Sequence, residues 1–361
     1  MTAIDAVASE GPTAEAARDA LTRGNAVDAV VAAVLVAAVA SPSVLLGPVQ
    51  MLVGGAGAGL LAIDGRVRQP GRGVSRPRGF VPDEVIPDAA RVAVPLLPSA
   101  LASALGSAGT TTLHRAAGAS LAWAKLHAPD RVRIAEALTR LGPAALAEGA
   151  VAEELLAVGG RASRGLLTPK DLVASRPAIH RVDTDRLGAS GIVRPPWASP
   201  HARAKRENGL GTPSGAHEEP PPSHSTSVVA AADARGLFAI ACYEGSLAGV
   251  PVASLGLVAP AYAVPVLRGR KRVSPGEPLA TPTAVAMRAS RGVVDLVLGI
   301  AGSGDLEAAL DAALSEIDRP GLPDAPPASS SSRAVGLVRT GGGSLRAVGP
   351  SQRTPFTDGV V

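Results

Sequence analysis

One run of sixteen residues places the strongest limit on what this chain can fold into. The segment NAVDAVVAAVLVAAVA, from Asn25 to Ala40, is the most apolar stretch of the sequence. It is too short to span a bilayer, and it carries Asp28 in its first turn. Asn25 can accept backbone N–H bonds as the N-cap, while Asp28 lies at the positive end of the helix dipole. The sequence therefore predicts a buried helix here, with a large core around it.

The composition shows what that core is made of. The chain has 361 residues, of which 46% are hydrophobic, enough for one large domain or two ordinary ones. Because only 2% are aromatic, the core is expected to consist of Ala, Val and Leu, and little surface is left for stacking bases. The net charge of +4 is scattered, and its one basic cluster, RGRKR at 268–272, is expected to be a solvated loop rather than a patch for anionic surfaces. We expect no nucleic-acid partner.

The cysteine and histidine content and the first residues of the sequence indicate which cellular compartment and which cofactors to expect. Cys242 is the one cysteine, which excludes a disulfide within the chain. The six histidines are dispersed, and His217 with Glu218 lacks the second histidine of a metallopeptidase helix, so we expect no metal and no other cofactor. The first residues, MTAIDAVASEGPT, show no basic stretch followed by an apolar one, so no secretory signal is visible and the cytoplasm is the expected location.

The first half of the chain has a helical pattern with one hairpin. A helix is expected over 13–24, ahead of the buried one, and the runs VQMLVGG and AGLLAIDG then predict a hairpin. Residues 66–90 have the Arg, Pro and Gly content of a surface loop, and residues 97–158 predict several helices in succession. A short helix follows with Thr168 as its cap, and residues 194–222 have the composition of a connector.

The second half changes to strands. STSVVAAAD and GLFAIACYE predict one hairpin, and TAVAMRA and GVVDLVLGI predict another. The helix DLEAALDAALSEI and two short strands follow. Helices ahead of two hairpins and a helix behind them indicate a layered α+β domain with a central antiparallel sandwich.

Common enzyme motifs are missing from this pattern. The segment GGAGAG at 54–59 lacks the Gly-Lys-Ser/Thr ending of a phosphate-binding loop. The segment from Gly57 to Ala62 fits a loose dinucleotide pattern, but a strand follows it instead of a helix. No G-x-S-x-G elbow occurs, which argues against an α/β-hydrolase serine.

The junction EEPPPSHSTSVVAAADARG, residues 218–236, remains as a candidate site. A hydroxyl residue that opens a strand after a linker is where N-terminal-nucleophile hydrolases place their reactive group. That hydroxyl attacks the peptide bond before it, and the freed α-amine, with a pKa near 7.7 to 8.0, then serves as the base. On residue types alone, an ordinary strand after a proline loop explains the junction as well.

Several segments in a fixed order resemble the gamma-glutamyltranspeptidase family. The box Gly24 to Ala29 is similar to the family's Gly-Asn-Ala-Val-Asp-Ala box. Further similar segments, in the family's order, are RVAVPLLPSAL, GLLTPKDLVASRPAI, IVRPPWASP, SHSTSVVAAADARG, RVSPGEPLATPTAVAM, LVLGIAGSGD and LRAVGPSQRTPFTDG. The resemblance implies the four-layer αββα sandwich of N-terminal-nucleophile hydrolases. It also implies self-cleavage into a large-subunit-like part, 1–193, and a small-subunit-like part, 223–361, with 194–222 as connector. The two parts would form one sandwich domain as a self-cleaved heterodimer.

The family's catalytic residues can be carried over onto this sequence. Alignment on SVV places Ser223 at the catalytic threonine, with Thr226 as the alternative nucleophile. Gly302 and Ser303 would supply the N–H groups of the oxyanion hole. The threonine that supports the nucleophile from the next strand falls on Cys242.

The family's substrate contacts are matched less well. Arg72, or failing that Arg76, lies where the family's arginine binds the substrate carboxylate, and Ser246 replaces an asparagine. The segment LGLVAPAYAV, between Leu255 and Val264, lacks the carboxylate that binds the substrate's amine, a loss of roughly 1.5 to 3 kcal/mol. Glutamyl substrates are therefore expected to bind poorly.

Two hypotheses about function follow from this comparison. The first is a gamma-glutamyltransferase-like amide hydrolase and acyl transferase that cleaves itself and acts on a small-molecule amide or peptide, glutathione-like or other. The second is a catalytically inactive family member that works as a binding or assembly protein. A third and weaker hypothesis, association with a membrane through the helix at 25–40, conflicts with the burial expected of that helix.

Overall fold

Helix α2 (Ala26–Ala40) is built as the sequence predicts. The Asn25 side chain accepts hydrogen bonds from the backbone N–H groups of Val27 and Asp28, at 2.9 and 3.0 Å, and the Asp28 carboxylate accepts the Asn25 N–H at 2.8 Å. Every residue of the helix except Ala40 is buried. The prediction of a capped and buried helix is confirmed.

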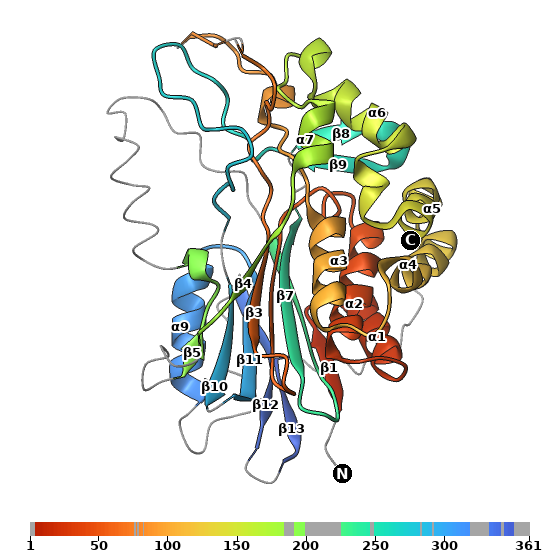
Figure 1. The fold of residues 1–361 in the computed structure, drawn as a ribbon, viewed down its shortest axis with the longest axis vertical. Helices are drawn as coiled ribbons and strands as arrows, with labels where there is room; N and C mark the ends of the chain where they lie inside the picture. Colours follow the sequence, from red (N-terminus) through yellow and green to blue (C-terminus); the bar gives the residue numbers. More distant parts are fainter. Residues whose placement is uncertain are drawn as a thin grey trace.

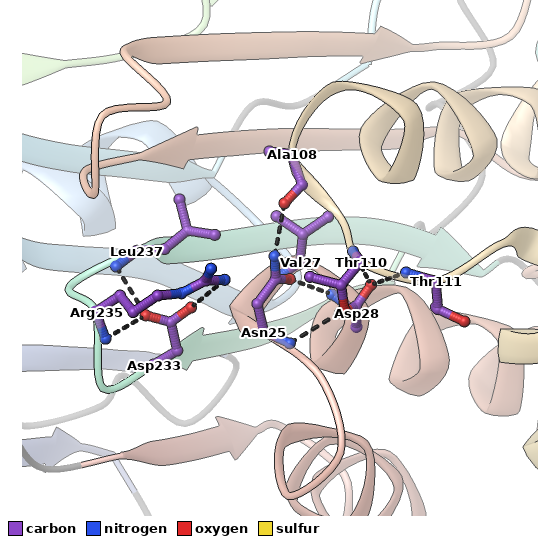
Figure 2. Close-up of polar contacts among 9 residues, drawn as sticks. All are labelled: Asn25, Val27, Asp28, Ala108, Thr110, Thr111, Asp233, Arg235 and Leu237. Carbon is purple, nitrogen blue, oxygen red and sulfur yellow. Dashed lines mark hydrogen bonds and ion pairs between the residues drawn. The ribbon is translucent and has the colours of Figure 1, made fainter.

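Asp28 also connects α2 to a distant part of the chain. Its carboxylate accepts hydrogen bonds from the backbone N–H groups of Thr110 and Thr111, at 2.9 and 3.1 Å, and from the Thr110 hydroxyl (Figure 2). A Cβ atom at position 24 would lie 2.5 Å from this carboxylate, so only glycine fits there. The box from Gly24 to Ala29 is therefore a structural element that fixes the start of α2 against the segment between two later helices.

The computed structural model describes residues 4–75, 77, 79–81, 83–183, 191–198, 225–245, 249–281, 284–290, 292–317, 332–340 and 343–349. The other helices are α1 (Gly11–Leu21), α3 (Leu97–Ala108), α4 (Leu113–His127), α5 (Val132–Leu141), α6 (Gly149–Gly159), α7 (Pro169–Ala174) and α9 (Leu306–Ile317). The helical pattern expected for 97–158 is thus confirmed as several helices.

The strands form two antiparallel groups. The first group is β1 (Asp5–Ala8), β6 (Ser225–Ala232), β7 (Phe238–Gly245), β2 (Val49–Gly54), β3 (Leu60–Gly65) and β4 (Ala178–Arg181), paired in that order. The second is β13 (Leu345–Val348), β12 (Ser332–Arg339), β11 (Val293–Gly302), β10 (Val285–Ser290) and β5 (Ile192–Val193). In the described residues, the pair Gly302 with Thr226 joins the two groups. All three predicted hairpins are present, and a separate pair, β8 (Gly249–Val252) with β9 (Leu257–Pro260), was not predicted.

The two faces of β6 lie in different hydrophobic clusters because strand side chains alternate. Val229 shares a cluster with α1 to α6, whereas Val228 shares a second cluster with residues of β10 and β11, such as Met287 and Val297. A third cluster packs α9 on the second group of strands through Leu310. In Figure 1, α1, α2 and α3 accordingly lie on one side of the strands and α9 on the other. The predicted α+β class is confirmed.

The apolar helix α2 lies inside the first of these clusters, so its side chains are not available to a lipid surface. Across the described ranges, no helix has both the length and the apolar character needed to cross a membrane.

The anchoring role of Asp28 can be measured. We expect Asp28→Asn to lower the free energy of unfolding by about 2 to 3 kcal/mol, because several buried hydrogen bonds lose their charged acceptor. Urea unfolding followed by circular dichroism measures this change. The control is Asp19→Asn, which removes an exposed ion pair with Arg23 and should change stability by less than about 1 kcal/mol. Equal effects of the two changes would contradict the anchoring role.

Candidate active site at the start of strand β6

Thr226 lies where the two groups of strands meet. It is the second residue of β6, and it pairs with Glu244 of β7 on one side and Gly302 of β11 on the other. Its side chain is 2% exposed. By alternation it occupies the same face of β6 as Val228, which faces the cluster shared with β10 and β11.

Glu244 is the polar partner of Thr226. One carboxylate oxygen, Oε1, accepts a hydrogen bond from the Thr226 hydroxyl at 3.5 Å, and Oε2 accepts one from the Tyr262 hydroxyl at 2.6 Å. Glu244 is 2% exposed. Burial raises the pKa of Glu244 to about 7, and the hydrogen bonds from Tyr262 and Thr226 offset only part of this effect. Glu244 was not among the predicted site residues, because nothing in the local sequence shows which side chain lies opposite Thr226.

Gly302 and Ser303 form the turn between β11 and α9. Gly302 has a φ of 126° and Gly304 a φ of 92°, a region that residues with a Cβ rarely adopt. The pairing brings Gly302 opposite Thr226, with the half-buried Ser303 directly after it. These two residues thus lie beside the alternative nucleophile, although their role in an oxyanion hole stays a prediction.

Of the other predicted substrate-binding residues, Arg72 lies within the described part of the chain. Ser223, Ser246 and Arg76 lie outside the described residues. The backbone N–H of Arg72 donates to the Asp171 carboxylate at 2.9 Å, and the Arg72 carbonyl accepts from the Thr168 hydroxyl at 3.1 Å, both residues belonging to the start of α7. The contacts that the structure gives Arg72 therefore do not include the start of β6.

Cys242, to which the resemblance assigned the supporting position, is a buried residue of β7. It pairs with Val228 on β6 and with Gln50 on β2. It lies two residues before Glu244 on the same face of β7. Burial raises the pKa of the Cys242 thiol to about 12. The assignment was made relative to Ser223, which lies outside the described residues, and it stays a prediction; opposite Thr226 the register of β6 and β7 places Glu244.

A second polar group lies further along the same sheet face, at the end of β3. Asp64 accepts hydrogen bonds from Arg66 at 2.8 Å and from Arg68 at 3.2 Å. All three residues are 5% exposed or less, so two buried guanidinium groups share one carboxylate. Burial alone would raise the pKa of Asp64, but the hydrogen bond and charge of Arg66 and the charge of Arg68 hold it below its usual value. Burial lowers the pKa of Arg68 even though Asp64 opposes this, as expected for a positive charge that is only partly compensated.

This cationic group lines a hollow of about 490 Å³, together with Arg176, His180 and Trp197. The Arg66 guanidinium lies 5.1 Å from the centre of the Trp197 ring, and the indole N–H donates to the Gln50 side chain. Since Asp64 lies three strands from β6, the hollow is roughly 14 Å from β6 across the sheet, at about 4.8 Å per strand. The charged residues that follow the apolar run in AIDGRVRQ were the sequence signal for this group. Residues 66–90 were predicted to be a surface loop, and the burial of Arg66 and Arg68 corrects this prediction for these two residues.

Another hollow, of about 550 Å³, is lined by Phe80, Arg164 and Thr168 and contains no residue of β6, β7 or β11. Within the described part of the chain, no three His, Cys, Asp or Glu side chains lie close enough together to hold a metal ion.

The raised pKa of Glu244 makes stability depend on pH. An acid whose pKa is about 7 in the folded chain and near 4.5 when unfolded stabilises the fold fully below pH 4.5, and this contribution is lost as the pH rises through 7. We therefore expect the unfolding free energy of the protein, minus that of Glu244→Gln, to fall between pH 5 and pH 8 by on the order of 3 kcal/mol. Urea titrations at several pH values measure it, and a difference that does not change with pH would contradict the assignment.

Comparison with known proteins supports the fold. LmbA2991 is similar over 98% of this chain and 98% of its own, with a TM-score of 0.67 and 14% identity. Cephalosporin acylase from Bacillus halodurans is similar over 84% of this chain and 78% of its own, with a TM-score of 0.56 and 15% identity. A gamma-glutamyltranspeptidase from Pseudomonas nitroreducens matches 48% of this chain and 65% of its own, at 18% identity and a TM-score of 0.41, too low to establish a fold.

At the level of sequence, no protein-family model matches the chain and no curated protein matches it. The likeness is thus one of fold and not of close sequence. The chain has a mixed α+β fold with an antiparallel sheet, similar to the folds of LmbA2991 and cephalosporin acylase.

Proposed function

We propose that the chain is an amide hydrolase or acyl transferase that cleaves itself and uses a hydroxyl at the start of β6 as its nucleophile. One observation carries this proposal: Thr226 pairs with both Glu244 and Gly302 at the junction of the two strand groups. The junction places a hydroxyl, a titratable carboxyl and a glycine turn together. The likeness of fold to LmbA2991 and cephalosporin acylase makes this class of reaction the first to test.

The geometry favours Thr226 as the nucleophile. Its hydroxyl lies on the inner face of the strand beside Glu244, while the preceding residue, Ser225, is exposed. Cleavage between Ser225 and Thr226 would leave Thr226 with a free α-amine that can act as base during turnover, since such an amine has a pKa near 7.7 to 8.0. Ser223 remains the alternative, with cleavage three residues earlier.

The proposal includes the finer architecture. Three hydrophobic clusters in succession, between helices and strands, between the two strand groups and between strands and α9, support a four-layer αββα arrangement. Self-cleavage would yield a large part that includes the connector at 194–222 and a small part that carries β6 and the later strands, held together as a heterodimer by the pairing of β6 with β1, of β7 with β2 and of β10 with β5.

The charges favour an amide whose acyl part ends in a carboxylate. Arg66 and Arg68 leave one buried positive charge uncompensated by Asp64, in a hollow on the same sheet face as Thr226. The segment from Leu255 to Val264 supplies no carboxylate for a substrate ammonium group. A dicarboxylic monoamide with a chain long enough to span the roughly 14 Å from β6 to the hollow therefore suits the site better than the gamma-glutamyl amide of a glutathione-like compound.

A catalytically inactive binding or assembly protein is the second candidate. The observation in its favour is that the Thr226 side chain is 2% exposed and that its hydroxyl is already engaged with Glu244. In this alternative the chain stays uncut and the junction is a structural contact between the strand groups.

Intact mass separates these two candidates. We expect the purified protein, after days at neutral pH, to give two fragments with a new N-terminus at Thr226, and Thr226→Ala to remain whole. Ser223→Ala should be cut like the unmodified protein. A new N-terminus at Ser223 that is absent in Ser223→Ala would identify Ser223 as the nucleophile. A single uncut mass under all conditions would instead support the catalytically inactive binding or assembly protein.

Kinetics with model amides test the substrate class. A p-nitroanilide of a long-chain dicarboxylic acid, whose carboxylate can reach the hollow roughly 14 Å from β6, should be hydrolysed faster than gamma-glutamyl p-nitroanilide. Arg66→Gln should raise KM for the long-chain substrate by about tenfold or more, because a charge-assisted hydrogen bond is lost. Arg115→Gln, at an exposed position of α4, serves as the control and should leave KM unchanged. A KM that rises in Arg72→Gln but not in Arg66→Gln would restore Arg72, whose guanidinium lies against Gly276 of the same hollow, as the carboxylate ligand.

A further inference from the structure

Self-cleavage at Thr226 needs a proton acceptor other than the α-amine of Thr226, which becomes free only after the cut. In the uncut chain the nitrogen of Thr226 belongs to a peptide bond, so it is not basic. The first step, in which the Thr226 hydroxyl attacks the carbonyl carbon of Ser225, must therefore pass its proton to another group. This question arises only within the proposed function, on which the inference rests.

Glu244 is the group in the right place. Its Oε1 lies 3.5 Å from the Thr226 hydroxyl oxygen, and the pairing of β6 with β7 fixes the two residues opposite each other. The Tyr262 hydroxyl, 2.6 Å from Oε2, occupies the other carboxylate oxygen and so holds the carboxyl group in orientation. Glu10 makes a similar contact with the next hydroxyl, that of Ser227, which by alternation lies on the opposite face of β6.

The surroundings of Glu244 are unusual for a residue with only a structural role. None of the ion pairs described for this chain involves Glu244, and the titratable groups that interact with it are Tyr262 and Cys242. A buried carboxylate without a cation is costly, and its persistence marks a candidate functional group. A pKa of about 7 suits the task, since an acid–base group is most effective when its pKa is near the working pH.

We propose that Glu244 is the proton-transfer group for self-cleavage between Ser225 and Thr226. The Glu244 carboxylate takes the proton of the Thr226 hydroxyl as that oxygen bonds to the Ser225 carbonyl carbon. The bond from this carbon to the Thr226 nitrogen then breaks, and the nitrogen receives the proton from Glu244. The products are an ester of Thr226 and a free amine.

Water completes the reaction. It attacks the ester carbon, giving its proton to the Glu244 carboxylate, and the Thr226 oxygen leaves and takes that proton back. Ser225 ends as a free carboxylic acid, Thr226 regains its hydroxyl, and Glu244 returns to its starting state. Atoms and protons balance with one water consumed.

Cleavage kinetics of the full chain test this role. The chain is pulse-labelled in a cell-free translation reaction and transferred to buffers between pH 5.5 and pH 8.5, and the uncut fraction is followed with time. We expect the rate to rise with pH and level off, with a midpoint near 7, because the carboxylate form is the active one. Glu244→Gln should be slower by a factor of about 100 or more, within the range of general base catalysis. Glu244→Asp should be slow but keep the rise with pH.

Two further variants separate proton transfer from a structural effect. Tyr262→Phe removes a hydrogen bond that favours the carboxylate, so the midpoint should move to higher pH. Glu10→Gln is the matched control, since it changes the carboxyl beside the neighbouring hydroxyl, and its profile should equal that of the unmodified chain. Circular dichroism verifies that each variant is folded.

The outcomes distinguish this inference from the proposed function. If the chain is cut before Thr226 but Glu244→Gln is cut at the same rate, or if the rate of the unmodified chain does not depend on pH, Glu244 is not the proton acceptor and the hydrolase proposal stands. Cleavage before Ser223 would also overturn the role of Glu244 at Thr226. An unmodified chain that is never cut would instead remove the self-cleaving function itself.

Discussion

Helix α2 is apolar on nearly every side, so the fold has to bury it on nearly every side, and the neighbouring helices and strands do so. Its apolar residues pack against α1, α3, α4 and the strands β6 and β7. On β6, the residues that face this helix cluster are Val229 and Ala231. Strand side chains alternate between the two faces of a sheet. Because Val229 and Ala231 face the helices, Thr226 and Val228 face the other group of strands. The burial of one helix thus decides which face of the sheet carries the candidate site.

That sheet face is apolar in its middle and charged at one end. Glu244 is a buried acid without a described cation, and three strands away Arg66 and Arg68 share the single carboxylate of Asp64. Each arrangement costs free energy of folding, because a buried charge lacks a full partner. The Glu244 carboxyl and the Arg66 and Arg68 guanidinium groups thus lack full ionic partners on one sheet face. A site that transfers a proton and binds an anion would require such groups.

The likeness of fold by itself does not supply a reaction. LmbA2991 and cephalosporin acylase share the architecture at 14% and 15% identity, and a fold of this kind can carry different chemistry. What favours an active hydrolase here is the local geometry at Thr226, together with the glycine turn at Gly302. The Thr226 side chain is only 2% exposed, and this burial favours the catalytically inactive alternative.

The elements that could be predicted from the sequence are those whose signals are local. The cap formed by Asn25 and Asp28, the buried helix after it and the hairpins follow from residues a few positions apart. The candidate site, in contrast, depends on contacts between residues far apart in the sequence. Glu244 lies 18 positions beyond Thr226 and Gly302 still further, and the register of three strands brings them together. Arg66 and Arg72 look alike in the sequence, but burial beside Asp64 distinguishes them, and burial is a property of the whole fold.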